Sequence, residues 1–175
     1  MILGLSIDNF VTLHVVISLV GIVTGLVAIP TLAAGRWLGG WHAIFLASTA
    51  ATSITGFLFP FGGITPGIVI GIISMIVLGV AYAAYLALNS AGWAGPIYAI
   101  SATIALYLNL FVLVVQGFMK VSWLHDLAPN QSEPPFAIAQ GLVLLFSLIM
   151  GFYAVRGARR IWLGRRVEAG RSVES

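Results

Sequence analysis

The chain has 175 residues, of which 60% are hydrophobic and 7% are charged. A soluble domain of this length needs a charged surface, and this composition cannot supply one. The sequence therefore predicts an integral membrane protein. It contains no cysteine, which excludes a disulfide framework and thiolate chemistry. No nucleotide-binding loop, metal-ligand cluster or catalytic triad stands out, so we expect neither a resident metal nor an enzymatic activity.

Five apolar runs follow one another along the chain. A helix needs about 20 apolar residues to cross a hydrocarbon core about 30 Å thick. The runs have about this length, exceed the strands of a membrane barrel about twofold, and do not alternate between apolar and polar residues. We predict an all-α bundle of five transmembrane helices within residues 1–157, followed by a basic cytoplasmic tail in residues 158–175. The predicted spans are residues 10–34, 42–59, 67–88, 96–118 and 136–155.

Proline residues and one capping residue mark the expected helix starts. Proline in the first turn removes an N–H group that has no partner there. We expect Pro66, Pro96 and the pair Pro134 and Pro135 to begin the third, fourth and fifth helices. Asp8 is the expected N-cap of the first helix.

Small residues indicate how the helices pack. Lipid supplies no hydrophobic drive between helices, so close backbone contact must replace it. Ser18, Gly21 and Gly25 share one face of the first helix, which predicts close packing there. The second predicted helix carries several hydroxyl residues, which we expect to bond to the preceding turn or to a neighbouring helix.

Lysine and arginine residues set the predicted orientation. Six of the seven arginines lie beyond residue 155, and Arg36 lies in the first connector. With five crossings and a cytoplasmic C-terminus, all seven arginines fall inside, Lys120 falls outside and the N-terminus is outside. We expect the tryptophans to form an interfacial belt, with Trp37, Trp41, Trp93 and Trp162 at the inner face and Trp123 at the outer face.

The basic segment that begins at Arg156 carries one aromatic anchor, Trp162. We expect its arginines to contact anionic lipid headgroups, at about 1 kcal/mol per residue near the surface. A nucleic-acid partner is not expected, because it would need a folded basic face or base-stacking aromatic residues. The expected partners are the lipid bilayer and either another membrane protein or a second copy of the chain.

The fourth predicted helix carries a polar stripe. Ser101, Asn109, Gln116 and Lys120 are spaced so that they stack on one side of the helix. Asn109 falls near mid-membrane, where a bare amide is costly. We expect its side chain to form a hydrogen bond with the hydroxyls of the second helix. The alternative is a polar track that opens outward through Gln116 to Lys120.

The stripe ends at the only long connector, residues 119–135, which is rich in polar and titratable side chains. Trp123, Leu124 and Leu127 lie within it and predict that it folds over the outer end of the bundle. Folding of this kind would form a partly desolvated polar pocket suited to a headgroup. The predicted ligand-binding residues are His14, Asn109, Gln116, Lys120, His125, Glu133 and Gln140.

The sequence therefore predicts a non-enzymatic membrane protein, either an accessory subunit or a binder of a lipid-like ligand at this outer site. An alternative is a redox protein, in which His14 and His125 ligate a b-type haem, or in which His14, Gln116 and Gln140 bind a quinone. His42 is expected at the membrane interface rather than as a ligand. An oligomeric channel or facilitator is a further alternative, whereas a secondary transporter is disfavoured because the helix centres lack charged residues.

Three stretches of the chain resemble small bacterial inner-membrane proteins with several helices, a group without an assigned activity. They are residues 52–61 (TSITGFLFPF), 106–112 (LYLNLFV) and 127–136 (LAPNQSEPPF). The resemblance implies a multi-pass protein of a bacterial inner membrane and implies no reaction.

The predicted orientation can be tested with a reporter that is active only in the cytoplasm. Fused after Ser175, the reporter is expected to be active, because seven arginines outweigh one lysine. Inserted after Asn130, in the long connector, the same reporter is expected to be silent. A silent C-terminal fusion would overturn the assignment of every connector.

Overall fold

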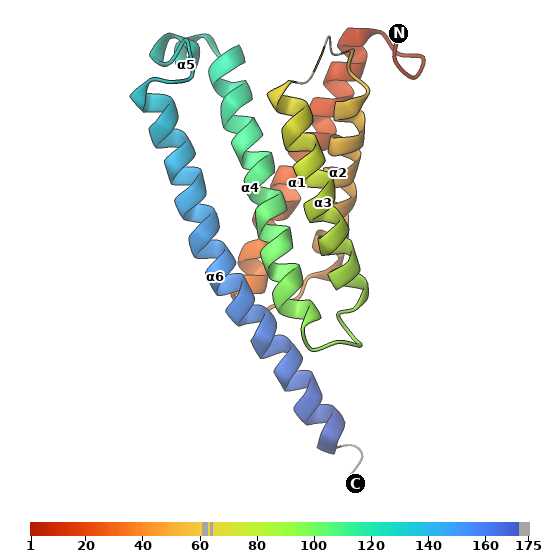
Figure 1. Ribbon diagram of the computed structural model, residues 1–175. Coiled ribbons are helices and arrows are strands. Elements are labelled where there is room, and N and C mark those ends of the chain that lie inside the picture. Colours follow the sequence, from red (N-terminus) through yellow and green to blue (C-terminus); the bar gives the residue numbers. More distant parts are fainter. Residues whose placement is uncertain (61–62, 64, 172–175) are drawn as a thin grey trace.

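The computed structural model describes residues 1–60, 63 and 65–171, with side chains as far as residue 162. These described residues form six helices and no strand (Figure 1). The helices are α1 (Ile7–Ala33), α2 (Gly39–Phe57), α3 (Pro66–Leu86), α4 (Ala94–Lys120), α5 (Ser122–Leu127) and α6 (Pro134–Arg171). The five long helices form a bundle, and the short α5 joins α4 to α6 at one end of it (Figure 1).

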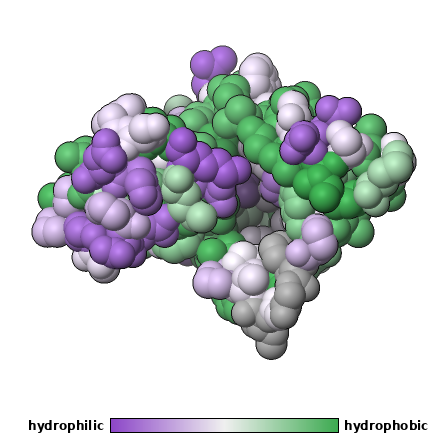
Figure 2. Space-filling model, turned by 90° about the horizontal axis from the view of Figure 1, so that it is seen from above, coloured by the Kyte–Doolittle hydropathy of each residue, from purple (hydrophilic) through white to green (hydrophobic). Residues whose placement is uncertain are grey.

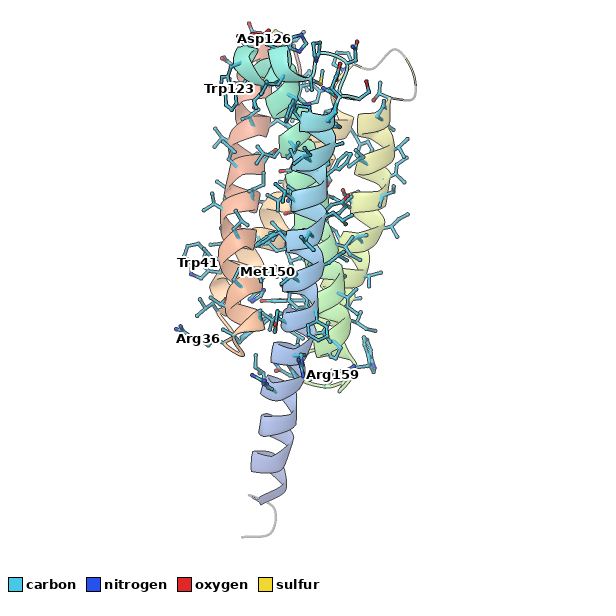
Figure 3. All side chains as sticks on the ribbon, turned by 90° about the vertical axis from the view of Figure 1, so that its left-hand side faces the viewer. Arg36, Trp41, Trp123, Asp126, Met150 and Arg159 are labelled. Atoms are coloured by element: carbon cyan, nitrogen blue, oxygen red, sulfur yellow. The ribbon has the colours of Figure 1, made fainter. Side chains whose placement is uncertain are left out.

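The bundle has two chemically different ends. We call the end that carries α5 the α5 end, and the opposite end, where Arg36 and Arg159 lie, the arginine end (Figure 3). Figure 2 looks onto the α5 end, where hydrophilic residues gather on the side of α5 and on the side of the N-terminus. The N-terminus lies at the α5 end, and α6 extends beyond the bundle at the arginine end (Figure 1).

Among the described residues, four helices are long and apolar enough to cross a membrane. They are α1, α3, α4 and the part of α6 from Pro134 to Trp162. The helix α2 does not belong to this group, because its Gly-Gly-Trp-His start and its serine and threonine residues lower its mean hydropathy. The all-α prediction is confirmed, and four helices indicate a multi-pass membrane protein. Length and composition do not assign α2 as a fifth span.

Most helix starts follow the predicted signals. Pro66 is the first residue of α3, and Pro134 is the first residue of α6. The helix α1 begins after Ser6, whose hydroxyl accepts a hydrogen bond of 3.3 Å from the backbone N–H of Asn9. The prediction that Asp8 caps α1 is therefore wrong. Asp8 lies in the first turn, where its charge favours the positive end of the helix dipole.

Two segments are more helical than the sequence predicts. The helix α6 continues past residue 155, the predicted end of the last span, as far as Arg171. Arginine and alanine favour helix, and no proline interrupts this stretch. The long connector contains α5, and Leu124 of α5 lies beside Gly117 of α4. The connector therefore folds onto the end of α4.

Small residues allow the helices to approach closely, as predicted. A Cβ atom at Gly25 of α1 would lie 2.8 Å from the side chains of Phe45 on α2 and Leu106 on α4, so only a very small residue fits there. The tightest approach is between α6 and α1, where a Cβ atom at Gly157 would overlap the backbone carbonyl group of Leu32. Glycine at this position permits the two backbones to touch.

Replacing Gly157 with alanine is expected to lower the free energy of unfolding by about 1–3 kcal/mol, because α6 must move away from Leu32. Gly141→Ala on the same helix is the matched control, since no atom lies within 4 Å of its Cβ position and alanine favours helix. Thermal unfolding of both variants in detergent measures the difference. An unchanged melting temperature for Gly157→Ala would contradict the close contact.

Candidate functional site

The polar stripe of α4 faces the bundle interior at Asn109. The amide of its side chain donates a hydrogen bond of 3.0 Å to the hydroxyl of Thr49 on α2. Thr49 is fully buried, and its hydroxyl also lies beside Gly21 of α1. The predicted interhelical hydrogen bond is confirmed, and it gives the amide a partner without a ligand. Gln116 and Lys120, farther along the stripe, are exposed.

His14 of α1 is tied to the end of α2. Its Nδ1 lies 2.8 Å from the hydroxyl oxygen of Thr55, and that hydroxyl donates its own hydrogen to the backbone carbonyl of Ala51. The Nδ1–H group of His14 is therefore the donor, and its Nε2 carries the lone pair. The ring also meets Phe59 edge-on, with the ring centroids 5.2 Å apart.

His125 is held by a different element. It lies on α5, and its Nδ1 is 3.3 Å from the backbone carbonyl oxygen of Phe118 on α4. Figure 1 shows α5 above α4 and α6, on the other side of the bundle from the first turns of α1. No observed contact joins His14 and His125 as a haem-ligating pair. Among the described side chains, no group of three or more histidine, aspartate or glutamate residues gathers around a metal position.

The other predicted residues of the long connector are bonded locally. Glu133 accepts hydrogen bonds from the side chain and backbone of Asn130 and from the backbone N–H of Ser132. Desolvation raises the pKa of Glu133, but hydrogen bonds to its charged form outweigh this effect, so the pKa is lowered. Gln140 of α6 donates a hydrogen bond of 3.2 Å to the backbone carbonyl of Phe111 on α4. These bonds order the connector and join α6 to α4, and the outer ligand site stays a prediction.

A buried aromatic cluster lies at the arginine end, around His42 of α2. Its ring stacks on Trp37, with the ring centroids 4.0 Å apart and the planes at 9°. Its Nδ1 lies 2.7 Å from the hydroxyl of Tyr98 on α4. Tyr85 of α3 and Trp162 of α6 pack around Trp37. The side chain of His42 is fully buried among these aromatic residues, so it faces protein and not headgroups or water, and its predicted depth at the membrane interface stays a prediction.

Sequence reasoning missed this cluster because its members come from four helices and one connector. Each of them alone is typical of a membrane interface, where aromatic residues gather. One feature of the sequence could have indicated the cluster. All of its members lie near predicted helix ends on the same side of the membrane. The cluster fixes α6 in place, because the indole N–H of Trp162 donates to the backbone carbonyl of Leu88 and its ring packs against Gly95 of α4.

A groove between α4 and α6 runs from the level of Leu144 to the arginine end. Its volume is about 670 Å³, and its wall is almost entirely apolar. The hydroxyl of Thr103 in this wall donates to the backbone carbonyl of Ala99, so it presents no free hydrogen to the groove. The lining includes Ile104 and Tyr107 of α4 and Leu148, Phe152, Arg156 and Arg159 of α6.

Positive charge is concentrated at one end of this groove. The guanidinium carbon of Arg156 lies 5.1 Å from the centre of the Phe152 ring, a distance at which a cation is attracted to the ring face. Arg159, one turn farther along α6, is exposed. The carboxylates among the described side chains all belong to the α5 end, and they are Asp8, Asp126 and Glu133.

No family model matches the chain, and neither a curated protein nor a solved structure matches it. The class of protein follows from the fold, which is an all-α bundle with four helices apolar and long enough to span a membrane among the described residues. The arrangement of α4 and α6 adds a surface groove that is apolar along its length and basic at one end.

Replacing Tyr98 with phenylalanine removes the hydroxyl that bonds to His42 and leaves a buried ring nitrogen without this partner. We expect the free energy of unfolding to fall by about 1–3 kcal/mol. Tyr153→Phe, on an exposed position of α6, is the control and is expected to change nothing. Thermal unfolding in detergent compares the two variants. A Tyr98→Phe variant as stable as Tyr153→Phe would refute a stabilising role for the histidine–tyrosine pair.

Proposed function

We propose that the protein is a non-enzymatic, multi-pass protein of a bacterial inner membrane that binds a lipid-like molecule between α4 and α6. One observation carries the proposal: an apolar groove of about 670 Å³ opens at the side of a bundle of membrane-spanning helices. Ligand pockets have volumes of about 300–1,000 Å³, so this groove can take a ligand. In a bilayer, lipids surround such a groove and can enter it from the side.

The proposal includes α2 as a fifth span. Three of its hydroxyls do not need water, because Ser48, Ser53 and Thr55 donate to backbone carbonyls of the preceding turn. A helix whose polar side chains are satisfied internally can cross a bilayer. Five crossings put the termini on opposite sides, and the excess of arginine at the arginine end supports a cytoplasmic C-terminus.

The apolar surroundings of the groove determine which interactions can retain a lipid in it. A lipid chain gains little by leaving the bilayer for the groove, because both surroundings are apolar. Retention therefore depends on van der Waals fit along the wall and on polar contacts at the basic end. The aromatic cluster supports the fit, since Trp162 holds α6 against α4 and a rigid wall loses little entropy when a ligand binds.

Filling the groove tests the proposal. Ile104→Trp places an indole in the groove wall, and Ile76→Trp changes another exposed isoleucine on α3, outside the groove. Native mass spectrometry in detergent with added dioleoyl phosphatidylcholine measures the lipid that each variant retains. We expect Ile104→Trp to retain about fivefold less lipid than the wild type, because overfilling a site costs about 1 kcal/mol or more.

The Ile76→Trp variant is expected to retain as much lipid as the wild type. Its melting temperature, compared with that of Ile104→Trp, separates loss of the groove from loss of the fold. Equal lipid retention by the two folded variants would contradict a lipid site between α4 and α6.

A further inference from the structure

We infer that the groove holds an anionic phospholipid, with one acyl chain along α4 and α6 and its phosphate at Arg156 and Arg159. This inference rests on the proposed function, because it requires that a lipid occupies the groove. It adds the chemistry of the headgroup and the two residues that bind it.

The two arginines lie where a headgroup must lie. They line the arginine end of the groove, and a spacing of three residues puts both on one face of α6. The contact of Arg156 with the ring of Phe152, which also lines the groove, holds this cation at the wall. A guanidinium presents a planar fork of N–H donors that matches the oxygens of a phosphate.

The depth of the arginines also fits a phospholipid. The helical rise from Pro134 to Arg156 is about 33 Å at about 1.5 Å per residue. The hydrocarbon core of a bilayer is about 30 Å thick. When the start of α6 lies at one membrane surface, Arg156 therefore lies at the level of the phosphates of the opposite leaflet. The apolar part of the groove then lies beside the acyl chains.

The charge of the site selects between headgroups. The described carboxylates lie at the α5 end, so the described side chains offer Arg156 and Arg159 no acidic partner at the arginine end. A phosphate supplies this missing negative charge. A zwitterionic headgroup also carries a cation, which is repelled by the guanidinium groups, whereas an anionic headgroup does not. The site should therefore favour phosphatidylglycerol over phosphatidylcholine.

A competition experiment tests the headgroup. The full-length protein in detergent is mixed with equal amounts of dioleoyl phosphatidylglycerol and dioleoyl phosphatidylcholine, and native mass spectrometry measures the ratio retained. We expect the wild type to prefer phosphatidylglycerol about thirtyfold, from two cationic contacts at membrane-surface strength. The double variant Arg156→Gln with Arg159→Gln is expected to lose this preference and to retain phosphatidylcholine as the wild type does.

Two further variants separate the site from general charge. Arg36→Gln removes an exposed arginine at the same end of the bundle but outside the groove, and it should keep the preference. Arg156→Lys with Arg159→Lys keeps both charges and should keep part of the preference for phosphatidylglycerol. This variant provides the comparison if the glutamine double variant fails to fold. Added inorganic phosphate should not displace the lipid, because it lacks the acyl chain.

Each contrary outcome has a distinct meaning. If Ile104→Trp retains as much of each lipid as the wild type does, the proposed function fails. If both lipids are retained equally by the wild type, or if Arg36→Gln loses the preference as fully as the glutamine double variant, the headgroup inference fails while the groove stands. Displacement by inorganic phosphate would assign a phosphate site without a lipid. A dimer that Ile104→Trp dissociates would assign the groove to a second copy of the chain.

Discussion

The contact between Gly157 and the carbonyl group of Leu32 determines how α6 crosses the bundle. A side chain at this glycine would overlap the backbone of α1, so the two helices approach as closely as backbones can. Trp162, one turn farther, locks the same end of α6 onto α4 through Gly95. At the α5 end, the edge-on contact of Phe118 and Phe136 at 5.4 Å joins α4 to α6 again. The groove lies between these two attachments.

Two polar side chains that the sequence singled out are paired within the protein, whereas the buried hydroxyls of Thr52 and Ser147 have no hydrogen-bond partner among the described residues. Asn109 of α4 bonds to Thr49 of α2, and His14 of α1 bonds to Thr55 of α2. Polar residues at helical spacing therefore describe interhelical contacts here, as expected where lipid offers no hydrogen bonds. The groove differs because its wall is apolar and its charge lies at one end.

In our proposal, the arginines of α6 serve both membrane orientation and ligand binding through their positive charge. Their charge resists transfer across the membrane, which favours a cytoplasmic C-terminus. The same charge, placed at the end of an apolar groove, offers a phosphate two cationic donors at headgroup depth. Orientation and ligand selection are therefore coupled in our proposal, because both depend on Arg156 and Arg159 remaining at one membrane surface.

Composition, hydropathy and periodicity were sufficient to predict an all-α membrane protein, the starts of α3 and α6, and the inward orientation of Asn109. These properties depend on single residues or on spacing within one helix, which a sequence displays directly. The cap at Ser6, the burial of His42 and the groove itself were decided by the tertiary structure. They depend on which helix faces meet, and contacts between residues far apart in the chain, such as Gly157 and Leu32, determine that arrangement.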